Sequence, residues 1–114
     1  MRVWVIDDEE AVLAMLGAAI EYCGHAAAAF REPAAAEAAL TAGEAPPDVV
    51  IVDWTLGGRP ALPWIQTWRA RLAEARWVVV SGDPAVRAAL PEGVEWLGKP
   101  FHLADLAALL EAEA

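Results

Sequence analysis

Short apolar runs alternate with longer segments of helical spacing along this chain. The runs at 2–6, 49–52 and 77–80 consist almost entirely of β-branched and aromatic residues, which is typical of strands buried on both faces. The run at 25–30 is weaker, and we interpret it as a strand because the segments on both sides leave room for little else. A fifth strand is predicted at 94–97.

Between the strands, apolar residues recur every three or four positions, the spacing of a helix with one buried face. The first helix is predicted from Glu9 to just before Gly24, the second from Pro33 to about Ala42, and a short fourth helix at about 84–90. The apolar positions of the third helix are Trp64, Ile65, Trp68 and Leu72, and those of the last helix are Leu103, Leu106, Ala107 and Leu110.

The segment LGGRPALP, between the third strand and the third helix, contains two glycines and two prolines, so we predict a loop there. Five strands thus alternate with five helices. This alternation predicts an α/β fold in which a five-stranded parallel sheet has helices on both faces. A chain of 114 residues is long enough for one buried core, so we expect a single domain over residues 1–114.

Seventeen acidic and eight basic residues give the chain a net charge of −9. A surface this negative repels nucleic acid and anionic lipid, so we expect no direct contact with either. The apolar runs are too short to span a bilayer, and Asp7 and Asp8 interrupt the start of the chain where a secretory signal would be apolar. A single cysteine, Cys23, rules out an internal disulfide, and we expect a cytoplasmic protein.

Reactive polar residues follow four of the five predicted strands. Asp7 and Asp8 follow the first strand, Asp53 the third, Ser81 the fourth and Lys99 the fifth. Taken singly, each is more simply explained as a turn or cap residue, and Asp8 is placed to cap the first helix. Their conjunction is more informative, because open parallel sheets bind ligands beyond the carboxyl ends of the strands. The sequence therefore predicts a site at that edge.

Three carboxylates in one cleft repel one another unless cations are present. Asp7, Asp8 and Asp53 offer the hard oxygen ligands that suit Mg²⁺, an ion that often completes its shell with phosphate oxygens. Lys99 is the only lysine beside seven arginines, and a compact ammonium can bridge Asp53 and a phosphoryl oxygen. With the Ser81 hydroxyl as a further donor, these are the parts for phosphoryl transfer onto an aspartate.

The motifs VIDDEE, VVIVDW, VVVSGD and LGKP follow one another along the chain. In order and spacing they resemble those of the receiver domain of two-component response regulators, and the likeness covers essentially the whole chain. The resemblance implies the flavodoxin-like fold of the chemotaxis regulator, with strand order 2-1-3-4-5. It implies a signalling phosphoacceptor rather than an enzyme. Its partners would be a sensor histidine kinase or phosphotransfer protein, and a downstream effector or a linked output domain.

The same resemblance implies a role for each residue of the site. Asp53 is implied as the phosphoacceptor, Lys99 as the phosphoryl-binding lysine followed by a cis Pro100, and Ser81 as the hydroxyl switch residue. The implied Mg²⁺ ligands are Asp7, Asp8, Asp53 and the backbone carbonyl of Thr55.

Three features depart from the family's pattern. The loop after Asp53, TLGGRP, lacks the family's common Met-Pro, and we interpret its glycines as turn residues. Trp96 stands three positions before the lysine, where the family usually has the Tyr or Phe that moves together with the switch hydroxyl. One interpretation is that the indole stays outward or serves as a fixed partner contact, and the other is that it packs on the last helix. The stretch from Ser81 to Lys99 is short by about one helical turn, which removes support for dimerisation through the fourth helix and leaves the oligomeric state open.

Two alternatives to a phosphorylatable receiver remain at this point. A receiver fold used only as a protein-binding module would not need the complete set of reactive residues. A small aspartyl-phosphate phosphatase would need an Asp-x-Asp pair on its nucleophile strand and usually a cap domain. Since the chain stops after the last helix, we expect either a regulator that acts alone through protein contacts or part of a longer regulator or hybrid kinase.

Overall fold

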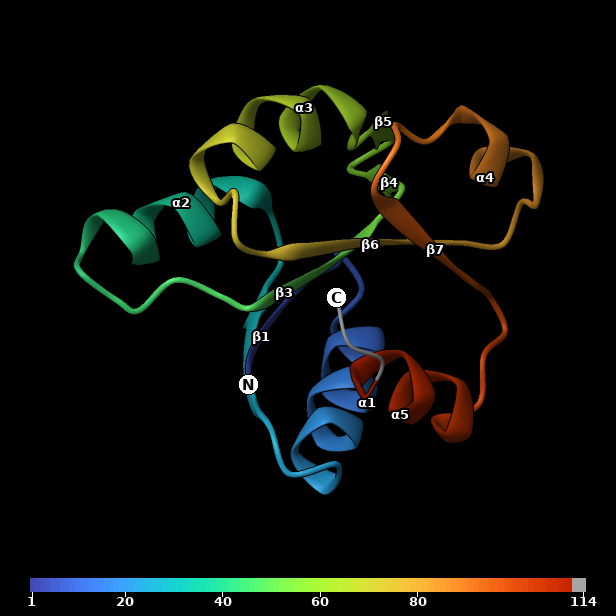
Figure 1. Ribbon diagram of the computed structural model, residues 1–114, viewed down its shortest axis with the longest axis horizontal. Coiled ribbons are helices and arrows are strands. Elements are labelled where there is room, and N and C mark those ends of the chain that lie inside the picture. The colour runs from blue at the N-terminus through green and yellow to red at the C-terminus, as the bar shows by residue number, and fades with distance from the viewer. Residues whose placement is uncertain (112–114) are drawn as a thin grey trace.

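The computed structural model describes residues 1–111. Strands and helices alternate along the chain, as the apolar pattern predicts (Figure 1). The strands are β1 (Arg2–Ile6), β2 (Ala26–Phe30), β3 (Val49–Asp53), β4 (Thr55–Leu56), β5 (Arg59–Pro60), β6 (Arg76–Ser81) and β7 (Val94–Gly98). The helices are α1 (Glu10–Tyr22), α2 (Pro33–Thr41), α3 (Leu62–Arg71), α4 (Ala85–Ala89) and α5 (Leu103–Glu111).

Five of the strands form one parallel sheet in the order β2-β1-β3-β6-β7. This confirms the predicted order 2-1-3-4-5, because β6 and β7 are the fourth and fifth strands of that sheet. Helices α1 and α5 lie on one face, and α2, α3 and α4 lie on the other (Figure 1). The order of the strands reverses at the neighbouring pair β1 and β3, the place where such sheets bind ligands beyond their carboxyl ends.

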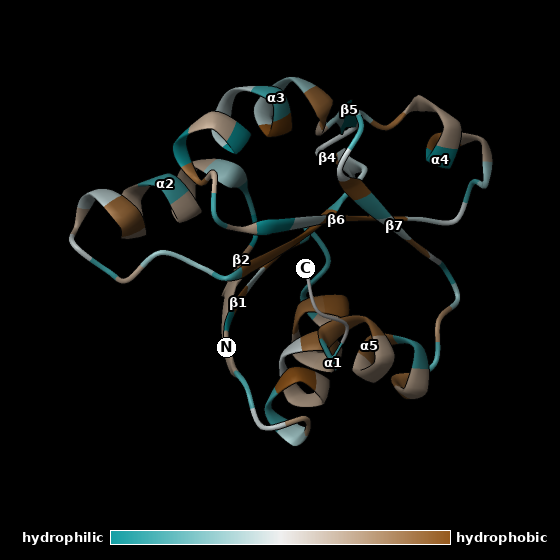
Figure 2. Cartoon of the chain, viewed as in Figure 1, coloured by the Kyte–Doolittle hydropathy of each residue, from teal (hydrophilic) through white to brown (hydrophobic). Residues whose placement is uncertain are grey.

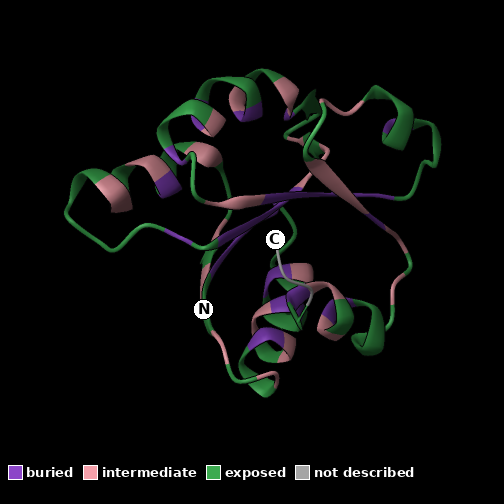
Figure 3. Cartoon of the chain, in the orientation of Figure 1, coloured by how far each residue is buried: buried purple, intermediate pink, exposed green. Residues whose placement is uncertain are grey.

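The sheet separates two hydrophobic cores, because successive residues of a strand point to opposite faces. In β1, Val3 and Val5 pack in the core with α1 and α5, whereas Trp4 and Ile6 pack in the core with α2 and α3. Hydrophobic residues predominate along α1 in Figure 2, and the central strands are buried in Figure 3. Burial on both faces explains why these strands are continuously apolar.

The helix ends follow from local residue chemistry. Gly24 and Gly43 come after α1 and α2 with φ angles of 90° and 93°, a backbone region that glycine adopts at little cost. Pro33 lies in the first turn of α2, where no backbone N–H is needed. Helix α4 has five residues, so the prediction of a short fourth helix is confirmed. No helix within residues 1–111 combines the length and apolar character needed to cross a membrane.

The predicted loop after β3 is wrong in part, because β4 and β5 form a two-stranded antiparallel hairpin. Gly57 and Gly58 make its two-residue turn, with φ angles of 58° and 78°. Two successive positive φ angles are typical of a type I′ turn, whose twist matches that of a hairpin. The two glycines therefore build a defined element beside the carboxyl edge of the sheet.

The beginning of β7 is tied to its neighbours by two arginines. Arg76 of β6 donates two hydrogen bonds to the Glu95 carboxylate, at 3.0 and 2.8 Å. Arg69 of α3 donates to the backbone carbonyl of Glu92, at 2.9 Å, just before the strand begins. These contacts fix the edge strand that leads to Lys99.

Candidate functional site

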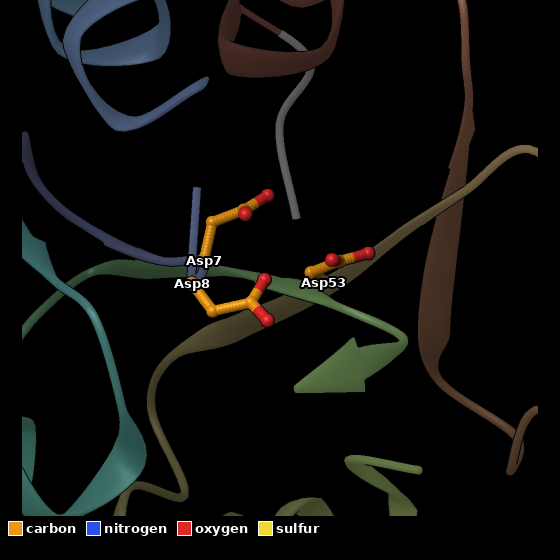
Figure 4. Close-up of side chains that lie close together, drawn as sticks. All are labelled: Asp7, Asp8 and Asp53. Carbon is orange, nitrogen blue, oxygen red and sulfur yellow. The ribbon is translucent and has the colours of Figure 1, made fainter. Parts of the chain in front are cut away.

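Three carboxylates meet at the carboxyl edge of the sheet. Asp7 and Asp8 directly follow β1, and Asp53 is the last residue of the neighbouring strand β3. Each of the three offers an oxygen within 4.8 Å of the others, and Figure 4 shows the side chains gathered around one point. The structure thus brings together the three acidic residues that the sequence predicts to share a site.

Lys99 is the cation of this cluster. Its ammonium nitrogen lies 3.6 Å from Oδ1 of Asp53 and 3.8 Å from Oδ2 of Asp7. The backbone supports this position, because the Lys99 N–H donates to the Ser81 carbonyl at 2.9 Å. The Lys99–Pro100 peptide bond is cis, as the family resemblance implies. The contact with Asp7 goes beyond the sequence prediction, which paired the lysine with Asp53 alone.

Burial dominates the ionisation of two of the carboxyls. Asp7 is 2% exposed, and its burial raises its pKa above the ordinary value; the Glu9 N–H and the Lys99 charge act in the opposite direction. Burial also raises the pKa of Asp53, where Lys99 again opposes the effect and the negative charge of Asp7 adds to it. The charge of Lys99 alone therefore does not bring the pKa of either carboxyl back to its ordinary value, and a further cation would lower both.

Asp8 is more exposed than Asp7 and holds the hairpin. Its Oδ2 accepts a hydrogen bond from the Gly57 N–H in the β4–β5 turn, at 3.2 Å. The expected capping of α1 by Asp8 is not observed, since Glu9 is the N-cap residue and no side chain caps it. Instead, Asp7 Oδ1 accepts the Glu9 N–H at 2.9 Å. Gly57 is therefore a site residue that sequence reasoning missed, and the pair of glycines was the available signal.

Thr55 begins the hairpin two residues after Asp53, paired with Pro60. The flanking pair is hydrogen-bonded, because the Ala61 N–H donates to the Trp54 carbonyl at 2.6 Å. In an antiparallel ladder, bonded and non-bonded pairs alternate, so the carbonyl of Thr55 points away from its partner strand. That carbonyl is thus free of the hairpin ladder, and its role as a metal ligand stays a prediction.

Ser81 lies at the same edge of the sheet, but its hydroxyl bonds to the backbone of Asp83. It is 7% exposed, and its hydroxyl accepts the Asp83 N–H at 3.0 Å and donates to the Asp83 carbonyl at 3.4 Å. Among the interactions recorded for residues 1–111, no hydrogen bond links this hydroxyl to Asp53. The structure therefore places Ser81 beside the cluster without joining it to the carboxylates.

Trp96 takes neither of the two positions expected from the sequence. Trp96 is partly buried and packs against the core on the α2, α3 and α4 side of the sheet, rather than on α5. The guanidinium of Arg87, on α4, lies 5.9 Å from the centre of the ring. The indole N–H is buried and has no hydrogen-bond partner in the described part of the chain.

The free energy gained by burying an indole is larger than the cost of leaving its N–H without a hydrogen-bond partner. A largely buried indole removes on the order of 150 Å² from water, which stabilises it by about 4 kcal/mol at ~25 cal/mol/Å². Leaving one buried donor without a partner costs about 1–3 kcal/mol. On these magnitudes, the apolar burial of an indole stabilises the chain by more than an unpaired N–H costs.

The cluster lies between two open cavities. A cavity of about 910 Å³ borders Asp8 and is lined by the end of β2 with the following Arg31, by the start of α2 and by the hairpin, including Phe30 and Arg59. A second cavity of about 420 Å³ borders Lys99 and is lined by Val12, Met15, Pro100 and Phe101 among others. The second is largely apolar, and Met15 beside it is 51% exposed.

The donor set of the cluster fits a small divalent cation. Oxygens bound to one Mg²⁺ ion at about 2.1 Å lie within roughly 4 Å of one another, so side-chain shifts of under an ångström would suffice here. All side-chain donors are carboxylate oxygens, the hard ligands that Mg²⁺ prefers. Burial raises the pKa of Asp7 and of Asp53, and the positive charge of such an ion would lower both.

The chain has relatives among proteins of known sequence. No protein-family model matches it. It is 30% identical over 116 residues to the transcriptional regulatory protein QseB of Haemophilus influenzae, which covers 98% of this chain and 52% of that protein. The chain thus spans about half the length of this curated relative.

Solved structures share its fold over nearly all its length. The receiver domain of the hybrid histidine kinase CckA superposes with a TM-score of 0.80 at 21% identity, covering 97% of this chain and 96% of that one. A response regulator receiver domain protein from Clostridium thermocellum gives 0.80 at 22% identity, covering 94% and 88%. NtrX from Brucella abortus gives 0.83 at 24% identity, covering 96% of this chain and 26% of that one. The chain therefore has the fold of a response-regulator receiver domain, and its resemblance to that family is confirmed.

Proposed function

We propose that this chain is a phosphorylatable receiver domain of a two-component system, formed by residues 1–114 as one unit, with Asp53 as the phosphoacceptor. The observation that carries the proposal is the position of the Lys99 ammonium, within 4 Å of both Asp53 and Asp7. A cation held against a carboxylate at the ligand-binding edge of the sheet can neutralise charge that develops during phosphoryl transfer.

In the proposed reaction, a carboxylate oxygen of Asp53 attacks the phosphorus of the donor. A bond from that oxygen to phosphorus forms, the bond from phosphorus to the donor breaks, and its electron pair leaves with the donor. The product is an acyl phosphate on Asp53. Lys99 would stabilise the charge on the transferred phosphoryl oxygens, since its three N–H donors rotate freely on a flexible chain.

The metal ligands in this proposal are Asp7, Asp8, Asp53 and the backbone carbonyl of Thr55. When bound there, Mg²⁺ supplies positive charge beside the phosphoryl oxygens. Around that position the protein supplies the orientation: the Glu9 N–H holds Asp7, and the Gly57 N–H holds Asp8. Both carboxylates are thus positioned by backbone donors before any ligand arrives.

Ser81 and Trp96 are proposed to carry the response to phosphorylation. The Ser81 hydroxyl would exchange its two contacts with Asp83 for a hydrogen bond to a phosphoryl oxygen. This exchange would release the segment between β6 and α4 and alter the surface around Arg87 and Trp96. A downstream effector, or an output domain linked to this one, would read that surface.

The donor is proposed to be a sensor histidine kinase or a phosphotransfer protein. The apolar cavity beside Lys99, with exposed Met15 at its rim, supports a protein donor that docks next to the acceptor. The curated relative is a transcriptional regulatory protein about twice as long as this chain, which supports an output domain as one form of effector.

The test is incubation with Mg²⁺ and acetyl phosphate, followed by measurement of the intact mass. We expect the mass of one added phosphoryl group in the wild type and in Glu74→Gln, an exposed carboxylate outside the cluster, but none in Asp53→Asn. Absence of the adduct in a folded wild type would instead favour a protein-binding module that uses the receiver fold without phosphorylation.

A further inference from the structure

Gly98, the residue before Lys99, has its side-chain space filled by another residue. A Cβ atom built on Gly98 would lie 2.5 Å from Cη2 of Trp96, 3.0 Å from Cζ2 and 3.1 Å from Cζ3. All three atoms belong to the far end of the same indole ring. The ring therefore lies along β7 and covers the place where any other residue would carry its side chain.

This place lies next to Ser81. Gly98 and Ser81 are register partners on the neighbouring strands β7 and β6, so positions 81 and 98 present their side-chain directions to the same face. Trp96 and Val79 are the next pair back on that face, and both pack in the same core. The tip of the indole thus reaches from position 96 to the space beside the Ser81 side chain, and Arg87 of α4 lies over the ring.

We propose that Gly98 is a positioning residue, whose missing side chain keeps the indole of Trp96 packed against the core beside Ser81. The size of residue 98 then determines whether the Trp96 side chain packs against the core or turns out to the surface formed by α4 and β7. The clash that a larger residue creates is with the end of a side chain that turns about two bonds, so the indole moves and the backbone of β7 stays. This inference goes beyond the proposed function.

The test follows the indole directly by fluorine NMR of protein labelled with 5-fluorotryptophan. The chain has six tryptophans, and the Trp96→Phe variant identifies the resonance of Trp96. In Gly98→Ala we expect that resonance to shift and to gain the solvent isotope effect of an exposed ring. The matched control is Gly82→Ala, also at a strand end, where an added Cβ has 3.9 Å to its nearest neighbours and the Trp96 resonance should not move. An unmoved, unexposed Trp96 in Gly98→Ala would overturn the proposal.

A double-mutant cycle keeps the proposal testable if Gly98→Ala folds poorly. Gly98→Ala should lower the urea midpoint in the wild-type background, because the added methyl group meets the indole. Trp96→Leu removes the far end of the ring, so in that background Gly98→Ala should leave the midpoint nearly unchanged. Equal losses in both backgrounds would show that the methyl group meets backbone rather than the indole, and would refute the positioning role. Neither readout uses a phosphodonor, so a failure of the proposed phosphorylation leaves this test intact.

Discussion

The ammonium nitrogen of Lys99 lies 3.6 Å from Oδ1 of Asp53, across the carboxyl edge of a sheet in which β6 separates their two strands. Both residues continue the row of side chains that faces α1 and α5, since Ile51 and Leu97 two positions earlier belong to that core. Strand alternation therefore directs the side chains of the single lysine and of the proposed phosphoacceptor to the same face of the sheet.

Lys99→Arg should leave the fold unchanged and slow phosphorylation of Asp53. A planar guanidinium is bulkier and prefers two-point contacts, so it does not reproduce an ammonium placed between Asp7 and Asp53. Loss of a charged hydrogen bond worth about 1.5–3 kcal/mol corresponds to a roughly ten- to hundredfold slower rate. The measurement is the rate of adduct formation with acetyl phosphate and Mg²⁺. Arg31→Lys, at an exposed pair, is the control, and an unchanged rate in Lys99→Arg would contradict the proposed role of the Lys99 ammonium in neutralising phosphoryl charge.

Asp53→Asn should stabilise the chain at neutral pH in the absence of divalent metal. The pKa of Asp53 is raised above 3.8 by burial, so between 3.8 and that higher value the folded chain binds more protons than the unfolded chain. Stability contributed by this group is therefore lost as pH rises through that window, and the penalty is complete above it. An amide carries no charge and escapes the penalty.

The measurement for this variant is the thermal midpoint Tm at several pH values. Each 1 kcal/mol gained raises Tm by roughly 4 °C for a chain of this size. We expect the gain of Asp53→Asn over wild type to shrink as the pH falls toward 4, and Mg²⁺ to raise Tm of the wild type more than that of the variant. Glu74→Gln, which removes an exposed charge, should show neither effect. A variant less stable than wild type at neutral pH would refute this assignment.

The main features of the fold were predictable because they depend on periodicity. The apolar runs that form β1, β3 and β6 are buried on both faces, and this alone indicates a parallel sheet with helices on both sides. Once the sheet is parallel, Asp7, Asp53 and Lys99 must share its carboxyl edge. The convergence of the acidic residues and the lysine was therefore predictable from the order of strands and helices.

The features that sequence reasoning missed depend on contacts between distant segments. The sequence predicts a loop with turn glycines after β3, but the pairing of β4 with β5 on either side of that turn is visible only in the folded chain. The indole of Trp96 lies where a side chain at position 98 would be, and Arg87 of α4 lies over it. The apolar pattern of the sequence gives no information about either contact. The orientation of Ser81 toward Asp83 is likewise a property of the folded loop.

Gly57→Ala should weaken Mg²⁺ binding because the turn that it strains holds Asp8. The φ angle of Gly57 is 58°, where a residue with a Cβ costs about 1–2 kcal/mol, so the turn and its N–H should shift away from Oδ2 of Asp8. Gly43→Ala is the matched control, since its φ angle of 93° is also positive but it lies outside the cluster, after α2. Both variants should lose stability, and only Gly57→Ala should need more Mg²⁺ in a titration followed by tryptophan fluorescence. Equal Mg²⁺ affinities would exclude a role for the hairpin in positioning Asp8.

Two ion pairs of unequal burial should contribute unequally to stability. The side chains of Arg76 and Glu95 are 12% and 40% exposed, and their two hydrogen bonds tie β6 to β7. Arg76→Ala should therefore lower the free energy of unfolding by about 1–3 kcal/mol. Arg31→Ala removes a pair whose side chains are 66% and 78% exposed and should cost under about 0.5 kcal/mol. Urea unfolding measures both, and similar losses would contradict this ranking.

The central claim, that Asp53 carries the phosphoryl group, is tested most directly by the chemistry of the adduct. Wild type, Asp53→Asn and Ser81→Ala are each incubated with acetyl phosphate and Mg²⁺, and the intact mass is measured before and after hydroxylamine. Hydroxylamine attacks the acyl carbon of an acyl phosphate and expels phosphate, leaving a hydroxamate on the aspartate, whereas a serine phosphate is retained. We predict a Mg²⁺-dependent adduct in wild type and Ser81→Ala that hydroxylamine removes, and none in Asp53→Asn. An adduct that survives hydroxylamine, or one that persists in folded Asp53→Asn, would contradict the claim.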